Sequence, residues 1–333
     1  MLVQYEKKHP LHTCRRVSNP LPTQQKPLCL TYFLLLFFSI GAIVQVHRLS
    51  HAVTNESRSS SILHFPSHYS PHSIPLRIFQ TWREPTHQIS SIAHQEVAST
   101  WTELNPDHRY ELLSDTAATN FVHSTFRSGI PALWDSLAAP VLRADLLRYL
   151  LMYAVGGVYS DFDTACRVPI KKWLAGGSYE HAQVIVGIEW DQLDDSPLNG
   201  AFVGQIQIVQ WTLMAAPRHP FYARVINEAA FRLQELAKHR PYGERLEVKS
   251  YHDAINTTGP WMFTDVLYEH LTDVSGKEFG WRNLSRLHEP LLVDDILILP
   301  MASWSPLNNG IRGVEATPAG LVEHLGYHTW GSW

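Results

Sequence analysis

The longest run of hydrophobic residues lies close to the N-terminus of the chain. Residues 28–46 (LCLTYFLLLFFSIGAIVQV) carry no charge, and as a helix they would be about 28 Å long, roughly the hydrocarbon thickness of a bilayer. Residues 44–46 make a poor cleavage site, which favours an uncleaved membrane anchor over the rival interpretation, a cleaved signal peptide. Five Lys or Arg residues precede the run and two follow in the next thirty positions, which predicts a cytosolic N-terminus and a lumenal remainder.

The rest of the pattern predicts two polar segments and one folded domain. Residues 1–27 are polar without periodicity, which predicts a cytosolic tail, and the Ser- and His-rich residues 47–73 predict a flexible stem. From 74 to 333, predicted strands alternate with predicted helices, which is typical of a parallel or mixed sheet flanked by helices. The strands are predicted at 74–79, 110–114, 158–163, 183–189 and 291–299, and the helices near 91–104, after a cap at Asp115, before Gly156, from about 216 towards Lys238, and at 261–271.

Residues 143–163 (RADLLRYLLMYAVGGVYSDFD) combine several local signals that agree with one another. Apolar residues recur at near-helical spacing at positions 146, 147, 150, 151 and 155, which predicts a helix. Gly156 and Gly157 are expected to end it, because glycine readily adopts the left-handed conformation found after helix C-termini. Residues 158–163 then read as a strand, and positions two apart on a strand share a face. Asp161 and Asp163 are therefore predicted to point the same way.

Two aligned carboxylates repel one another, so a partly buried pair is tolerated chiefly when a cation lies between them. Hard oxygen ligands suit Mn²⁺ or Mg²⁺, which typically also contact phosphate oxygens. An isolated Asp-x-Asp arises by chance about once in a chain of this length, so the prediction depends on the surrounding helix, glycines and strand.

A second polar pair lies within the helix that precedes the glycines. Asp145 and Arg148 are three residues apart and project from one face of an otherwise apolar helix. The alternative is an ordinary ion pair on the protein surface.

Composition limits the classes of function. The chain has 333 residues, 45% of them hydrophobic, which is compatible with a single catalytic domain. A net charge of −4 gives no electrostatic reason to expect a nucleic-acid partner. Of the three cysteines only Cys166 would face the lumen, so the fold is expected to stand without an intramolecular disulfide.

The stretch RADLLRYLLMYAVGGVYSDFD resembles the donor-site signature of glycosyltransferase family 32, the Asp-x-Asp sugar-binding glycosyltransferases, and the likeness runs from about Ile74 to Trp333. Within that family the chain is most like the fungal initiation-specific α-1,6-mannosyltransferases. The resemblance implies a GT-A-like nucleotide-sugar-binding domain and a single-pass type II protein of the Golgi membrane. It also implies transfer of mannose from GDP-mannose to a mannose of an N-glycan on glycoproteins, with retained anomeric configuration and dependence on Mn²⁺ or Mg²⁺. A complex of Golgi mannosyltransferases is an expected partner.

The resemblance also suggests roles for individual residues. Asp163 is expected to ligate the metal directly and Asp161 to contact the ribose or donor sugar and reach the metal through water. Asp145 and Arg148 are expected to hold the sugar hydroxyls and the diphosphate, with Tyr159 lining the sugar pocket. Trp82, Gly259, Asp265 and the C-terminal Ser332 and Trp333 are further donor-binding candidates, and His328 is a candidate third metal ligand.

Each of these assignments has a plainer alternative. Trp82 would equally serve as a core tryptophan, Gly259 as part of a simple helix-start turn, and the aromatic C-terminus as a tail docked on the core. At the level of function, mannosyltransferases that act on inositol phosphorylceramide share the donor motif, although they carry further hydrophobic spans after the catalytic domain. A third reading is an inactive lumenal sugar-binding protein, which the retained acidic pair argues against.

Overall fold

The computed structural model describes most of the predicted folded domain: residues 63, 73–85, 92–127, 129–174, 179–194, 196, 198, 202, 204–239, 244–248, 250–304 and 320–326. The predicted tail, the predicted membrane anchor and nearly all of the stem lie outside these residues. Within the described residues, no helix is both long and apolar enough to span a bilayer.

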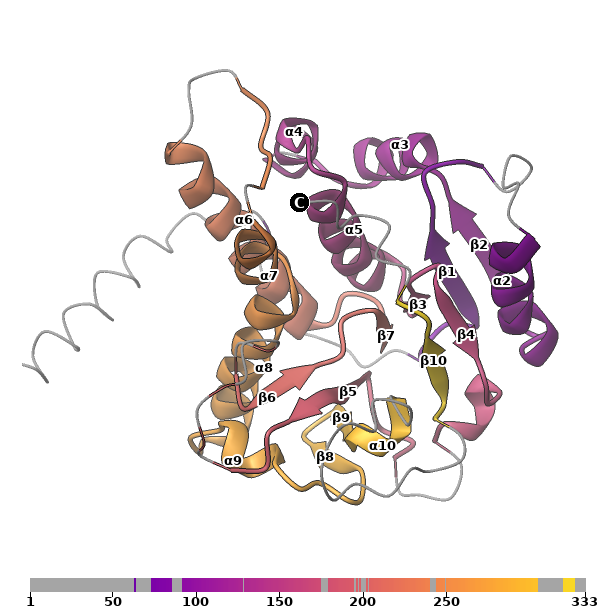
Figure 1. The fold of residues 1–333 in the computed structure, drawn as a ribbon, viewed down its shortest axis with the longest axis vertical. Helices are drawn as coiled ribbons and strands as arrows, with labels where there is room; N and C mark the ends of the chain where they lie inside the picture. The colour runs from indigo at the N-terminus through magenta and orange to yellow at the C-terminus, as the bar shows by residue number, and fades with distance from the viewer. Residues whose placement is uncertain are drawn as a thin grey trace, which may run out of the picture. The chain divides into compact units, whose positions relative to one another are not determined.

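A mixed β-sheet forms the centre of the domain (Figure 1), as the alternating pattern predicts. Its strands run in the order β2-β1-β3-β7-β5-β9-β8, and β6 pairs with β5 off this path. β1 is parallel to β2 and β3, β7 is antiparallel to β3 and β5, and β9 is parallel to β5. The strand bounds are β1 Arg77–Thr81, β2 Arg109–Leu113, β3 Gly157–Ser160, β5 Val184–Asp191, β6 Ile206–Ile208, β7 Thr212–Ala215, β8 Leu291–Val293 and β9 Ile296–Leu299.

Successive residues of the central strands face two different hydrophobic cores. Phe79, Tyr159 and Val184 belong to the larger core, whereas their neighbours in the chain, Ile78 and Val158, belong to the smaller core on the opposite face. This alternation is the two-residue period of β-structure. The central strands are therefore buried on both faces of the sheet, and they read as nearly continuous apolar runs.

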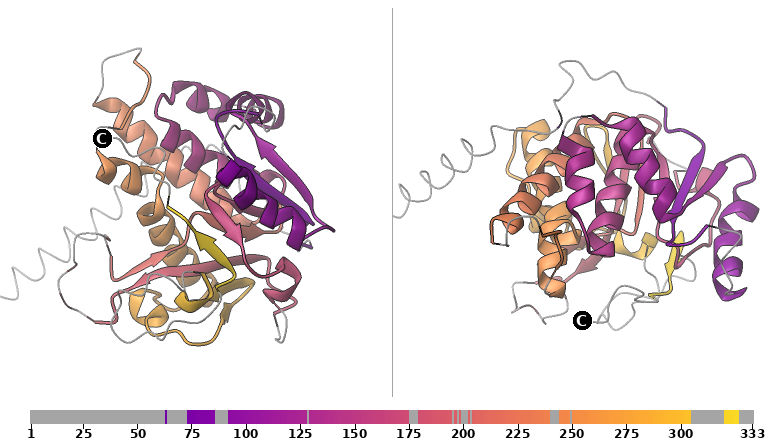
Figure 2. Two further views of the ribbon diagram at one scale, coloured as in Figure 1. Left: turned by 45° about the vertical axis from the view of Figure 1, so that its right-hand side comes forward. Right: turned by 90° about the horizontal axis from the view of Figure 1, so that it is seen from above.

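Helices cover both faces of the sheet, and Figure 2 shows these layers from two further directions. Side chains from α3 to α9 pack into the larger core. α2, a short 3₁₀ helix, α10 and a small two-stranded sheet of β4 and β10 supply the smaller core. The helix bounds are α2 Ile92–Leu104, α3 Asp115–Thr125, α4 Gly129–Ser136, α5 Pro140–Ala154, α6 Pro220–Lys238, α7 Tyr251–Thr257, α8 Pro260–Ser275, α9 Trp281–Leu284 and α10 Met301–Trp304, with the 3₁₀ helix at Ile170–Lys172, β4 at Thr164–Cys166 and β10 at Val322–His324.

The twin glycines connect α5 to β3 as predicted. Gly156 and Gly157 have φ of +70° and +98°, a region that residues with a side chain rarely adopt. A Cβ atom on Gly156 would lie 2.7 Å from the Ala215 carbonyl oxygen, and one on Gly157 would lie 2.6 Å from that of Arg77. Glycine is thus required both for the chain reversal and for the close approach of β1 and β7.

Three local predictions need correction. Ser114, not Asp115, caps α3, because its side chain accepts a hydrogen bond from the Ala117 amide. The predicted strand at 291–299 is two antiparallel strands, β8 and β9, joined by a turn in which Asp294 has a φ of +53°. The strand predicted for 158–163 ends at Ser160, so both aspartates of the acidic pair follow the strand.

Candidate active site

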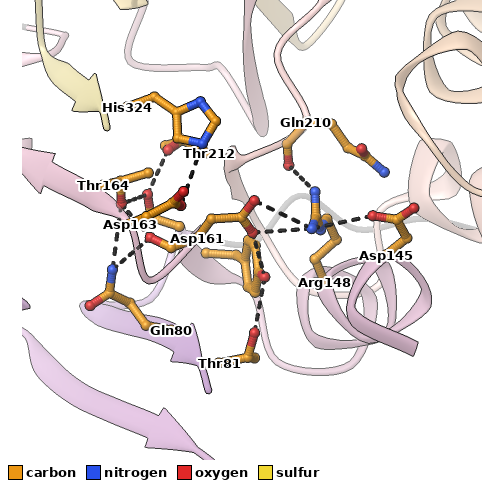
Figure 3. A network of polar contacts seen from close by, with 12 residues as sticks. Gln80, Thr81, Asp145, Arg148, Asp161, Asp163, Thr164, Gln210, Thr212 and His324 are labelled. Atoms are coloured by element: carbon orange, nitrogen blue, oxygen red, sulfur yellow. Dashed lines mark hydrogen bonds and ion pairs between the residues drawn. The ribbon is translucent and has the colours of Figure 1, made fainter. Parts of the chain in front are cut away.

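Asp161 and Asp163 lie in a tight turn between β3 and β4. The Thr164 amide donates to the Asp161 carbonyl oxygen at 3.1 Å, which closes the turn and reverses the chain. The prediction that the two carboxylates lie together is confirmed, but the reason differs, because the turn and not strand alternation brings them together. Figure 3 shows the two side chains next to each other.

Buried polar side chains hold this turn in place. The side-chain amide of Gln80, at the end of β1, donates to the Asp161 carbonyl oxygen at 2.9 Å. The hydroxyl of Ser160 bonds to the hydroxyls of Thr164 and Thr212 at 2.7 and 2.6 Å. Since these partners are fully buried, the aspartates are attached to the rigid sheet and not to a loose loop.

His324 lies beside the two aspartates and completes a possible metal-binding group. Sequence analysis did not identify this histidine as a candidate ligand. Antiparallel pairing of β10 with β4 places His324 opposite Thr164, and the Leu325 amide donates to the Asp163 carbonyl oxygen at 2.9 Å. One ligand atom each from Asp161, Asp163 and His324 lie within 4.8 Å of one another. The predicted third ligand, His328, lies outside the described residues.

The electrostatics of this group fit a divalent cation. Burial raises the pKa of Asp161, the Arg148 guanidinium lowers it, and the charge of Asp163 raises it again, with a net increase. Burial opposes charge on His324, but its hydrogen bond to Asp163 and the two carboxylate charges raise its pKa above the ordinary value. A cation bound between these side chains would offset the carboxylate repulsion, and His324 lies 3.4 Å from Asp163. Two carboxylates and an imidazole are a ligand set that suits Mn²⁺, so the residues fit the predicted metal.

Asp145 and Arg148 form the second half of the site, and they are deeply buried. Their exposed fractions are 4% and 6%, which excludes the alternative of a surface ion pair. Arg148 Nη2 lies 3.2 Å from Asp145 Oδ1 and 3.1 Å from Asp161 Oδ1, so one guanidinium bridges two carboxylates from different elements. Nη1 donates to the Gln210 carbonyl oxygen at 3.2 Å. Figure 3 shows Arg148 between the two aspartates.

Two further side chains orient these groups. The hydroxyl of Tyr159 donates to Asp161 Oδ1 at 2.7 Å, and its ring lies below the Arg148 guanidinium, 5.2 Å from centroid to Cζ. The hydroxyl of Thr258 donates to Asp145 Oδ2 at 2.8 Å. Burial raises the pKa of Asp145 to about 6, although Arg148 and Thr258 lower it.

The remaining predicted donor-binding residues fall in different places. Trp82 is half-buried and packs against Phe162, with ring centroids 5.0 Å apart, so it lies beside the acidic turn. Gly259 is in the turn after Thr258, where a Cβ would lie 2.5 Å from the Ile255 Cα, so glycine is needed for backbone packing. Asp265 instead pairs with Arg232 of α6 at 3.3 Å. Ser332 and Trp333 lie outside the described residues.

The comparisons with known proteins agree with this geometry. Residues 92–180 match the model of the glycosyltransferase sugar-binding region containing the DXD motif. The matched segment includes Asp145, Arg148 and the acidic turn, in which Asp161-Phe162-Asp163 is the DXD motif. The segment that builds the site therefore matches the sugar-binding region of DXD-containing glycosyltransferases.

Individual proteins show which glycosyltransferases the chain is similar to. The chain is 32% identical over 267 residues to the initiation-specific alpha-1,6-mannosyltransferase of Schizosaccharomyces pombe, an alignment that covers 77% of this chain and 64% of that protein. It is 29% identical over 124 residues to inositol phosphoceramide mannosyltransferase 2 of the same organism, covering 37% of this chain and 35% of that protein. The PaToxG glycosyltransferase structure covers 69% of this chain and matches 80% of its own length at 14% identity, with a TM-score of 0.41.

Proposed function

We propose that the protein is a retaining α-1,6-mannosyltransferase that moves mannose from GDP-mannose to a mannose of an N-glycan. One observation carries the proposal: Arg148, which is paired with the buried Asp145, also contacts the carboxylate of Asp161 in the DXD turn. The similarity to an initiation-specific mannosyltransferase over most of the chain supports the choice of mannose and of the N-glycan.

The chemistry required is displacement of a nucleoside diphosphate. The bond between the anomeric carbon and the diphosphate oxygen breaks, a bond from that carbon to the acceptor oxygen forms, and the hydroxyl proton of the acceptor passes to the departing diphosphate. A divalent ion held by Asp161, Asp163 and His324 would neutralise the negative charge of that leaving group. Arg148 supplies a permanent positive charge beside it, and Asp145 offers a carboxylate oxygen to the hydroxyls of the donor sugar.

The wider setting is part of the same proposal. A GT-A-like domain, a type II anchor at residues 28–46 and a Golgi location follow from the family resemblance and from the charge pattern around the apolar run. Association with other Golgi mannosyltransferases is proposed on the same basis.

The test is a donor and acceptor panel with the purified full-length chain and Mn²⁺. GDP-mannose and UDP-linked hexoses are each offered with an oligomannose glycan, and the product is analysed by mass spectrometry and by NMR of the new linkage. We expect an α-1,6-mannosyl product from GDP-mannose only. Transfer from UDP-hexoses alone would disprove the mannose assignment.

A second candidate function is mannosyl transfer to inositol phosphorylceramide, favoured by the similarity over 37% of the chain. Adding that lipid in mixed micelles to the same panel separates the two, because preferential mannosylation of the lipid would replace the glycan proposal. A chain that neither transfers mannose nor hydrolyses GDP-mannose would instead be the inactive sugar-binding protein.

A further inference from the structure

A fourth carboxylate, Glu189, lies near the DXD turn and has no role in the proposed reaction. It stands on β5, where Oε1 accepts a hydrogen bond from the Trp211 indole at 2.9 Å and Oε2 accepts one from Gln207 at 2.8 Å. The Trp211 ring stacks on His324 with centroids 4.9 Å apart and planes 20° apart. The Trp211 ring therefore connects Glu189 to His324, and the position of Glu189 is fixed by two donors.

Glu189 keeps hydrogen-bonding capacity for a ligand. Each carboxylate oxygen has about two acceptor positions, and one on each oxygen is used by the indole and the amide. Glu189 is partly exposed, in contrast to the buried Asp145 and Arg148. A carboxylate held rigid at the outer side of a glycosyltransferase site is suited to accept hydrogen bonds from neighbouring sugar hydroxyls.

Tyr251 supplies an exposed aromatic ring at the start of the helix that leads to Thr258. It begins α7, is 47% exposed, and is one of four large apolar side chains exposed among the described residues. α7 leads directly to Thr258, which bonds Asp145, so this helix of about 10 Å connects the outer side chain to the buried end of the site. Burial, and then the charges of Glu189 and Asp145, raise the pKa of Tyr251.

The depth of these groups indicates which substrate they meet. The donor's diphosphate must reach Asp161 and Asp163, and its sugar must approach the buried Asp145. An acceptor glycan is large, so we expect it to contact the more exposed side chains. Aromatic rings and carboxylates are a common pairing for the apolar face and the hydroxyl edge of a sugar.

We propose that Glu189 and Tyr251 bind the acceptor sugar, with Glu189 accepting hydrogen bonds from its hydroxyl groups and the Tyr251 ring packing against its face. This inference rests on the proposed function, since it requires a sugar acceptor. The competing explanation is that Glu189 acts only through Trp211, by orienting His324.

The experiment compares E189Q, Y251A and Y251F with the wild-type full-length chain, and E235Q is the matched control because Glu235 pairs with Lys238 on the exposed side of α6. Two rates are measured with GDP-mannose and Mn²⁺: transfer to an oligomannose glycan and hydrolysis without acceptor. We expect E189Q and Y251A to raise the KM for the glycan about tenfold or more and to lower the ratio of transfer to hydrolysis to the same extent. Y251F, which keeps the ring, and E235Q should match wild type.

Three results would overturn the inference. Equal losses of transfer and hydrolysis in E189Q would assign Glu189 to the donor side, and a loss of Mn²⁺ affinity that parallels the loss of transfer would assign it to His324. Glycan binding measured by saturation-transfer NMR, with GDP and Mn²⁺ present, gives a readout independent of turnover. Failure of wild type to transfer mannose would refute the proposed function, whereas unchanged glycan binding in E189Q and Y251A would refute this inference alone.

Discussion

Asp161 divides the site into two halves that balance charge differently. On the buried side, Arg148 bridges Asp145 and Asp161, so the protein itself supplies the positive charge. On the other side, Asp161, Asp163 and His324 are partly exposed, and their ligand atoms lie within 4.8 Å of one another, close enough to share a divalent ion. The comparison indicates that Arg148 is a permanent cation that stabilises the buried half. In the other half, an exchangeable metal ion would serve a diphosphate that binds and leaves.

The sharpest way to break this comparison is to remove a carboxylate from the exposed half. We expect D163A to lower mannosyl transfer by at least about 10³-fold, since the charge of the leaving diphosphate loses its counter-ion. The free energy of unfolding should change by less than about 1 kcal/mol, because loss of the His324 contact is offset by relief of the repulsion with Asp161. D107A, at an exposed position, is the control. Retained transfer in D163A would refute the proposed role of the DXD motif.

In the buried half, we expect substitutions to have a large effect on the free energy of unfolding. R148M leaves two carboxylates without their partner, and we expect it to lower the free energy of unfolding by about 3–5 kcal/mol in denaturant titrations. D145N should cost less, because burial already raises the pKa of Asp145 to about 6 and so makes the neutral group less unfavourable. If D145N were more destabilising than R148M, the positive charge of Arg148 would not be the main stabilising group of the buried half.

The third prediction distinguishes the two histidines. H324A should weaken Mn²⁺ binding by about tenfold or more, since loss of a ligand costs at least as much as loss of an outer partner. H328A serves as the comparison, because sequence analysis favoured His328. Calorimetric titration of Mn²⁺ into both variants with GDP present decides the matter, and a loss confined to H328A would assign the third ligand to the C-terminal segment.

The smallest expected effect is the pH dependence of Asp145. Its folded-state pKa of about 6 exceeds the ordinary 3.8, so between these values the folded state binds more protons than the unfolded chain. Lowering the pH through 6 therefore stabilises the fold at this residue, and raising it removes that stability. Between pH 7.5 and 5, the stability of wild type relative to D145N should increase by about 1 kcal/mol. A difference that stays constant with pH would show that the Asp145 pKa is not raised.

The sequence by itself determined the parts of this protein that rest on neighbouring residues. The apolar period predicts α5, the glycine pair predicts its end, and the three-residue spacing of Asp145 and Arg148 predicts their pairing. These signals are readable because helix geometry, left-handed backbone and side-chain spacing are properties of a few consecutive residues.

Only the tertiary structure decided how the site is completed. His324 belongs to a three-residue strand too short to show a pattern, and it meets Asp163 because β10 pairs with β4. Glu189 reads as the end of a buried strand, and Thr258 as part of a turn, until packing brings them to Trp211 and Asp145. Even the two aspartates converge through a turn stabilised by Gln80 from another strand. Such contacts join segments distant in the chain, and no local periodicity encodes them.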